Sequence, residues 1–204
     1  MRIAILLFDR FTALDAVGPY QMLCYLPGAE TVFAAERTGP FQDDAGALSL
    51  VADRTLAELT APDILVVPGG PGQLDQMENG ALLDRLRALD ATTTWTTSVC
   101  TGSLLLAGAG LLKGRRATSH WAALEQLRTY GVEPVSERVV TDGKYLTAAG
   151  VSAGMDMGLT LAGRVAGDRF AQRVQLLTEY DPQPPYDAGS PAKAPADLVA
   201  ELRG

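Results

Sequence analysis

The chain has 204 residues and a formal net charge of −7, with 47% apolar and 20% charged residues. This length fits one domain that buries roughly 70% of the surface of its unfolded chain. Its apolar runs stay short of the roughly 20 residues that a membrane-spanning helix needs, and its basic residues adjoin at Arg115 and Arg116 without forming a larger cluster. We therefore expect neither a membrane role nor binding to nucleic acid.

The first half of the chain alternates between strand and helix patterns. The N-terminal apolar run predicts a buried strand rather than a secretory leader, because no small-residue cleavage site follows it, and we expect a cytoplasmic protein. The helix that follows contains Pro19, which should kink it. The elements predicted here are a strand at 3–8, a helix at 12–26, a strand at 31–36, a polar loop at 38–46 and a short helix at 56–59.

The second half continues the same alternation. Asp142 and Gly143 lie between two short β-rich runs, which predicts a hairpin, and Ser152 is placed to cap the helix after it. The elements predicted are strands at 64–67 and 94–99, and helices at 81–89, 121–130, 152–165 and 170–177. Five prolines beyond Asp181 predict an extended tail over 181–204, with a short helix at 196–202. We expect one domain over 1–180, followed by this tail.

Alternating strands and helices predict an α/β fold: a single-domain, open, mostly parallel sheet with helices on both faces, of the flavodoxin-like or amidotransferase-like kind. In such sheets ligands bind beyond the carboxyl ends of the strands. The strand at 3–8 leads towards Asp15, the strand at 64–67 ends at the glycine-rich turn 69–72, and the strand at 94–99 ends at Cys100. We therefore expect these three features at one rim of the sheet.

Cys100 lies where a strand gives way to a helix, in the sequence TWTTSVCTGSLLL at 94–106. Gly102 and Ser103 are small enough for a sharp reversal of the chain, which is the geometry of a nucleophile elbow. The N–H groups at the start of the helix favour a thiolate there, the reactive form of cysteine. The alternative is that Cys100 is a small core residue, since free cysteine is often buried. Cys24, among apolar neighbours, is predicted to be such a core residue, and neither thiol is expected in a disulfide.

The turn PGGPG at 68–72 raises the question of phosphate binding. It lacks the lysine and the hydroxyl residue of a P-loop and does not match the dinucleotide pattern. A better use of its glycines is a close backbone approach, with the N–H groups of Gly70 and Thr101 directed at negative charge on a substrate bound to Cys100. Without Cys100 opposite it, the turn would be read as an ordinary one.

Asp15 and His120 are the remaining candidates for chemistry. Asp15 lies within an apolar pattern, so it is either a solvated helix residue or a partly buried acid with a raised pKa suited to proton transfer. His120 is the single histidine of the chain, and a lone histidine is more often structural, so we expect it to line a pocket at most. With one histidine and no CxxC pair, the sequence predicts no metal site and no cofactor.

The PGGPG turn, the segment VCTGSLLLAGAGLLKGRRATSHW at 99–121 and the acid in LDAVGP together resemble the ThiJ/PfpI superfamily, whose fold is that of class I glutamine amidotransferases. The resemblance covers about residues 1–180, and its specific part is the Cys100 segment. Within the superfamily the sequence is most similar to isonitrile hydratases and to the amidase-like domains of AraC-type regulators. Thr101 stands where the protease-like members carry histidine, and Asp15 where many members carry glutamate, so peptidase activity is not expected.

The resemblance implies that Cys100 is the nucleophile, that Asp15 is the acid or base beside it, and that Thr101 orients groups by hydrogen bonding. It also implies a homodimer. The activity implied is addition of water to a small-molecule isonitrile, giving an N-substituted formamide through a thioimidate on Cys100 with proton transfer by Asp15.

Two alternatives remain from the sequence. A ligand-sensing domain would carry nearly the same motifs, but such regulators continue into a helix-turn-helix, whereas this chain continues into a proline-rich tail, so we expect a free-standing enzyme. The second alternative is an enzyme acting on small α-oxoaldehydes, or a stress protein that senses oxidants through Cys100.

Overall fold

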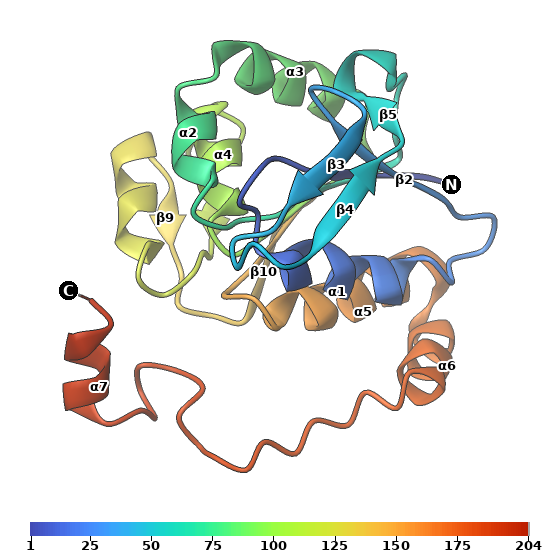
Figure 1. Cartoon of the computed structure of the whole chain (residues 1–204). Coiled ribbons are helices and arrows are strands. Elements are labelled where there is room, and N and C mark those ends of the chain that lie inside the picture. Colours follow the sequence, from blue (N-terminus) through green and yellow to red (C-terminus); the bar gives the residue numbers. More distant parts are fainter. Residues whose placement is uncertain (204) are drawn as a thin grey trace.

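The computed structural model describes residues 1–203, so Gly204, the last residue of the expected tail, lies outside the described residues. A seven-stranded sheet with helices on both faces forms the centre of the molecule, as predicted (Figure 1). Its strand order is β10-β11-β7-β6-β1-β2-β5. The β10–β11 pair is antiparallel and the other pairs are parallel. The strands are β1 (Arg2–Leu6), β2 (Glu30–Ala35), β5 (Arg54–Thr55), β6 (Ile64–Val67), β7 (Trp95–Val99), β10 (Val139–Asp142) and β11 (Tyr145–Ala148).

The helices form two layers. On one face, α1 packs against α5, and α5 packs against α6, while α2, α3 and α4 cover the other face (Figure 1). Pro19 lies inside α1, and Asn79 caps α3 by accepting a hydrogen bond from the Leu82 N–H. The helices are α1 (Ala13–Leu23), α2 (Gln73–Met77), α3 (Gly80–Asp90), α4 (Gly102–Gly108), α5 (Ala153–Ala166), α6 (Asp168–Leu177) and α7 (Ala196–Glu201), with short 3₁₀ helices η1 (Leu56–Glu58) and η2 (Leu124–Tyr130).

Three local expectations from the sequence are wrong. The polar region at 38–46 begins a hairpin of β3 (Gly39–Gln42) and β4 (Ser49–Ala52), separate from the main sheet. The helix expected at 121–130 is the 3₁₀ helix η2, which starts later; it follows the strand β8 (Arg116–Ala117), which pairs with β9 (Glu133–Pro134). Ser152 lies at the N-cap of α5, but its side chain makes no cap hydrogen bond and instead accepts one from Arg138.

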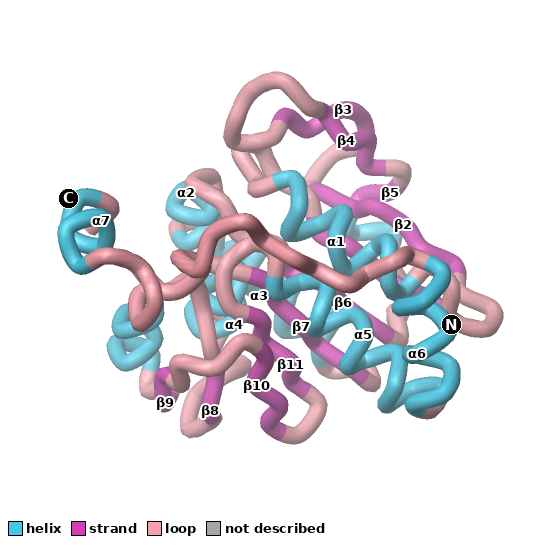
Figure 2. The backbone as a smooth tube through the Cα atoms, turned by 90° about the horizontal axis from the view of Figure 1, so that it is seen from below, coloured by secondary structure: helices cyan, strands magenta, loops and turns pink. Residues whose placement is uncertain are grey.

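The C-terminal segment leaves the packed body after α6. Figure 2 shows it crossing the side of the molecule that α1 and α5 form, before it ends in α7. It returns to the body at Trp121, which lines a small cavity together with residues of α7. The Arg203 guanidinium lies 5.7 Å from the centre of the Trp121 ring. The tail is therefore anchored at its far end.

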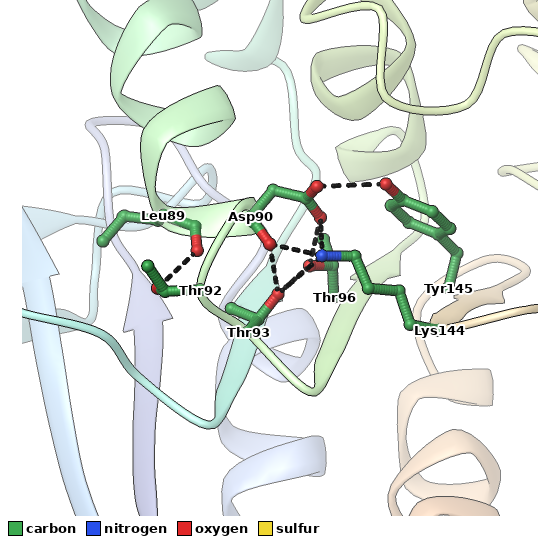
Figure 3. A network of polar contacts seen from close by, with 7 residues as sticks. All are labelled: Leu89, Asp90, Thr92, Thr93, Thr96, Lys144 and Tyr145. Carbon is green, nitrogen blue, oxygen red and sulfur yellow. Dashed lines mark hydrogen bonds and ion pairs between the residues drawn. The ribbon is translucent and has the colours of Figure 1, made fainter.

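A buried polar network joins α3 to the beginnings of β7 and β11 (Figure 3). Oδ1 of Asp90 accepts a hydrogen bond from Thr96 Oγ1 at 2.6 Å and lies 3.1 Å from Lys144 Nζ. Its Oδ2 accepts from the Tyr145 hydroxyl at 3.0 Å. The Lys144 ammonium also donates to Thr93 Oγ1 at 3.3 Å. Both oxygens of this nearly buried carboxylate are thus paired, which removes most of the cost of placing a charge there.

Candidate active site

Three neighbouring strands end at one edge of the sheet and bring the candidate residues together. In the strand order, β1 lies beside β6, and β6 lies beside β7. Because these strands are parallel, their carboxyl ends share an edge, as the sequence predicts. Asp15 lies in the first turn of α1, the glycine turn follows β6, and Cys100 follows β7.

Cys100 occupies a strained turn between β7 and α4. Its backbone has a φ of 58°, in the left-handed region that a non-glycine residue adopts only when its surroundings enforce it. Its N–H donates to the carbonyl oxygens of Ala148 and Ala149, both at 3.1 Å. Its carbonyl oxygen accepts from the hydroxyls of Ser103 at 3.2 Å and Ser119 at 3.1 Å. These four bonds hold the strained residue in place.

The turns after β6 and β7 approach so closely that glycine is required in both. A Cβ on Gly102 would lie 2.1 Å from the Val67 carbonyl oxygen, and one on Gly69 would lie 2.5 Å from the Thr101 nitrogen. Such distances exclude any side chain. The close approach explains why small residues follow Cys100 and why paired glycines follow β6.

Asp15 is fully buried, and one of its carboxylate oxygens has no partner. Its Oδ2 accepts a hydrogen bond from the Gly69 N–H at 2.9 Å, whereas its Oδ1 makes no hydrogen bond with any of the described residues. Burial raises the pKa of Asp15 to about 7, against the opposing effects of the Gly69 N–H and of the Cys100 thiol. Of the two readings of Asp15 from the sequence, the structure supports the buried acid.

Burial opposes ionisation of the Cys100 thiol, whereas the helix start was expected to favour a thiolate. Its side chain is 5% exposed, and burial raises its pKa to about 12, with a further contribution from the charge of Asp15. The N–H groups of Thr101 and Val151 lower the pKa of the thiol but do not outweigh burial. The Thr101 N–H at the start of α4 therefore lowers the pKa of the thiol, as predicted, but burial by the surrounding protein raises that pKa by more. Asp15 lies close enough to the thiol for each group to shift the pKa of the other.

The N–H of Gly70 is not free for a substrate in this structure. It donates to the Thr101 hydroxyl oxygen at 3.1 Å, which differs from the expectation that it is directed at charge developing beside Cys100. The Thr101 N–H does interact with the Cys100 sulfur. The second backbone donor to the sulfur is Val151, which the sequence reasoning missed.

Val151 could have been found from its surroundings. It lies in the small-residue run AAGVSAG at 148–154, just before a helix, as Cys100 lies just before α4. Its φ of 36° marks a second strained non-glycine turn. Two helix starts therefore meet at one sulfur atom.

His120 lies in the wall of a cavity beside the turn between β11 and α5. Its Nδ1 accepts a hydrogen bond from the Ala122 N–H at 3.3 Å, and its ring packs so closely on Gly150 that a Cβ there would lie 2.7 Å from the ring carbon Cδ2. Burial lowers the pKa of His120, which favours the neutral ring. The structure thus agrees with the expectation that this histidine lines a pocket.

Two other kinds of site are absent from residues 1–203. No group of three or more His, Cys, Asp or Glu side chains in this range is arranged to hold a metal ion. No helix in the same range is both long and apolar enough to cross a membrane.

Residues 1–164 match the DJ-1/PfpI family. The chain belongs to this family. A solved structure of a ThiJ/PfpI family protein from Pseudomonas syringae matches the chain with a TM-score of 0.96 and 38% identity, covering 99% of this chain and 84% of that one. These findings confirm both the resemblance seen in the sequence and the predicted fold class.

Two curated relatives represent different functions within the family. Isonitrile hydratase of Pseudomonas putida is 43% identical over 203 residues, covering 100% of this chain and 89% of that protein. The HTH-type transcriptional regulator CdhR of Pseudomonas aeruginosa is 36% identical over 129 residues, covering 62% of this chain and 38% of the regulator. The similarity to the hydratase extends over the C-terminal tail as well as the α/β domain.

Proposed function

We propose that this protein is a cysteine-dependent isonitrile hydratase, which converts an isonitrile and water into an N-substituted formamide. The observation that carries the proposal is the proximity of the Cys100 thiol to Asp15, a buried acid whose Oδ1 makes no hydrogen bond with the described residues. Identity of 43% to a curated isonitrile hydratase over the length of the chain supports the choice of reaction.

The first step adds the thiol to the isonitrile. Because the pKa of Asp15 is about 7 and that of Cys100 about 12, the resting pair above pH 7 is a carboxylate and a thiol. Asp15 takes the thiol proton as sulfur bonds to the terminal carbon of R–N≡C, and returns that proton to the same carbon. The product is a thioimidate, R–N=CH–S–Cys100, and Asp15 is again a carboxylate.

The second step consumes water. Asp15 takes a proton from a water molecule as the water oxygen bonds to the thioimidate carbon. It then passes that proton to the imine nitrogen, which gives R–NH–CH(OH)–S–Cys100 and leaves Asp15 as a carboxylate. The carbon–sulfur bond then breaks, the hydroxyl proton passes through Asp15 to the sulfur, and the formamide R–NH–CHO leaves. The N–H groups of Thr101 and Val151 already interact with the sulfur. They stabilise the negative charge on it when the thiol loses its proton and again when the carbon–sulfur bond breaks.

The test is product identification with purified protein. Incubation with cyclohexyl isonitrile should yield N-cyclohexylformamide, and Cys100→Ala should reduce the rate to background, by about 10⁴-fold or more. Methylglyoxal, supplied separately, should give no product. Formamide production by Cys100→Ala would remove the mechanism, and conversion of methylglyoxal alone would favour the α-oxoaldehyde alternative.

Ligand sensing is a second candidate, because CdhR resembles 129 residues of this chain. A sensor would bind an isonitrile or another small molecule without turning it over. Sensing of oxidants is disfavoured, because the pKa of about 12 keeps Cys100 protonated and oxidation proceeds through the thiolate. Saturable binding without formamide release by the wild-type protein would support the sensor.

We further propose that the protein is a cytoplasmic homodimer. Large apolar side chains at the end of α6 and in the tail have no cover within the chain: Leu176 is 79% exposed, Leu177 62% and Tyr186 81%. A second copy would bury them. Light scattering of the full chain in solution should give the mass of a dimer, and a monomer at micromolar concentration would contradict this proposal.

A further inference from the structure

Arg138 lies immediately before β10 and binds the turn that carries Val151 at both ends. β10 pairs with β11, and β11 leads into this turn, residues 149–152, which precedes α5. The Arg138 carbonyl oxygen accepts a hydrogen bond from the Ala149 N–H at 3.0 Å. Its guanidinium donates to the Ser152 hydroxyl oxygen at 3.2 Å. A single residue thus contacts the turn both before and after Val151.

The guanidinium also binds the first turn of the helix that follows. Nε of Arg138 donates to Asp156 Oδ2, and Asp156 lies in the first turn of α5. Oδ1 of the same carboxylate accepts a hydrogen bond from the Tyr180 hydroxyl at 3.2 Å. Tyr180 lies between α6 and the tail. Arg138 therefore connects the turn with the start of α5 and, through Asp156, with the segment that leads into the tail.

The turn needs such contacts because its backbone is strained. Val151 has a φ of 36°, which a β-branched residue adopts only when its surroundings enforce it. Its N–H interacts with the Cys100 sulfur, but a thiol is a weak acceptor of hydrogen bonds and stabilises the strained turn little. The hydrogen bond from the Gly154 N–H to the Val151 carbonyl oxygen, at 3.3 Å, joins the turn only to its own helix. The contacts with Arg138 constrain the turn from outside.

We propose that Arg138 is a positioning residue, which holds the turn at 149–152 so that the Val151 N–H faces the Cys100 sulfur. The inference rests on the proposed function, because this N–H matters most when negative charge forms on the sulfur. Without it, the Thr101 N–H would be the remaining backbone donor, and the charge would be stabilised less.

The exposure of Arg138 separates this role from a contribution to overall stability. Its side chain is 52% exposed, and exposed ion pairs contribute little to the free energy of unfolding. Arg116 offers a matched control, because its side chain is 50% exposed and lies 3.3 Å from Glu137. That pair involves the residue next to Arg138 but not the turn at 149–152. Loss of either guanidinium should therefore leave the protein folded.

The kinetic test compares Arg138→Met with Arg116→Met in the full chain. With cyclohexyl isonitrile, kcat of Arg138→Met should fall by about 10–10²-fold, the size of effect that misplacement of a catalytic group by about 1 Å produces. KM should change little, because the lost interaction forms with charge in the transition state. Arg116→Met should keep the kcat of the wild type. Arg138→Lys keeps a positive charge near Asp156 and should recover part of the loss.

A spectroscopic measurement reports the position of the donor directly. In protein labelled with ¹⁵N-valine, the Val151 amide resonance is assigned by its loss in Val151→Ala. The amide proton should shift upfield in Arg138→Met, because its hydrogen bond to the sulfur is weakened, and should stay in place in Arg116→Met. Ser152→Ala, which removes only the hydroxyl that Arg138 binds, should shift the resonance and lower kcat in the same directions. It carries both measurements if Arg138→Met does not fold.

The outcomes distinguish this inference from the proposed function. Turnover by the wild type, with an unchanged kcat and Val151 resonance in Arg138→Met, would overturn the role of Arg138 and leave the hydratase standing. A shifted resonance in Arg138→Met, without turnover of isonitrile by the wild type, would support the hold of Arg138 on the turn and overturn the hydratase. A lower kcat with an unchanged resonance would contradict the positioning role.

Discussion

Two buried aspartates lie at opposite ends of β7, and they differ in how far their oxygens are paired. Asp90, near the start of the strand, receives hydrogen bonds or an ion pair at both oxygens, from Thr96, Lys144 and Tyr145. Asp15, near its end, receives one backbone hydrogen bond at Oδ2 and none at Oδ1. A carboxylate with a complete set of donors holds elements together, whereas one with a missing donor has an oxygen left to exchange a proton.

The largest expected effect is a difference in enzymatic activity between variants of the two aspartates. Asp15→Asn keeps the shape of the side chain but cannot carry the proton, so formamide production should fall by about 10²–10⁴-fold. Asp90→Asn should keep activity within severalfold of the wild type when both are assayed as folded protein. Steady-state kinetics with cyclohexyl isonitrile measure both variants. Full activity of Asp15→Asn would mean that another group moves the proton.

The next effect is the dependence of stability on pH that Asp15 produces. Its pKa is raised from 3.8 to about 7 in the folded state, so between pH 4 and pH 7 the folded protein retains a proton that the unfolded chain loses. Stability from this group therefore falls as pH rises through that window. Asp15→Asn removes the dependence, so its stability relative to wild type should increase by roughly 2–4 kcal/mol from pH 4 to pH 8. Urea unfolding of both proteins at pH 4 and at pH 8 measures the stability of the variant relative to wild type. The same relative stability at the two pH values would show that Asp15 is not an acid of raised pKa.

The smallest effect concerns the Asp90 network. Asp90→Asn removes the negative charge that pairs with Lys144. It also replaces one of the two oxygens that accept hydrogen bonds from the Thr96 and Tyr145 hydroxyls. The free energy of unfolding should therefore fall by about 2 kcal/mol. Urea unfolding at pH 7 provides the measurement. Lys144→Met is the matched variant, because it removes the other partner of the same pair. A gain of stability in Asp90→Asn would show that the network does not hold α3 against the sheet.

The central part of the fold follows from local sequence patterns. The strands predicted at 64–67 and 94–99 are runs rich in apolar and β-branched residues, and the structure has strands at Ile64–Val67 and Trp95–Val99. The hairpin of β3 and β4 was not predicted, because its residues are mixed in character and alternate weakly. The same holds for η2, because periodicity alone does not distinguish an α-helix from a 3₁₀ helix.

The candidate site was predictable in position but not in its protonation state. The rule for parallel sheets places Asp15 and Cys100 at one edge, and in the structure they lie close enough to shift each other's pKa. The pKa of Cys100, however, is raised by burial, and the residues that bury it are distant in the sequence. The sequence shows only the helix start, whose N–H groups lower the pKa by a smaller amount. Val151 was missed for a related reason, since its backbone N–H rather than its side chain faces the sulfur.

The sheltered state of Cys100 affects how the protein responds to chemical labelling. Cys24, which the sequence predicts in the core, is partly exposed and is the more accessible of the two free thiols, so we expect a general alkylating reagent to modify it before Cys100. A count of accessible thiols therefore gives no measure of functional protein. An active-site titrant for this chain has to resemble the substrate closely enough for Asp15 to deprotonate the thiol while the reagent is bound.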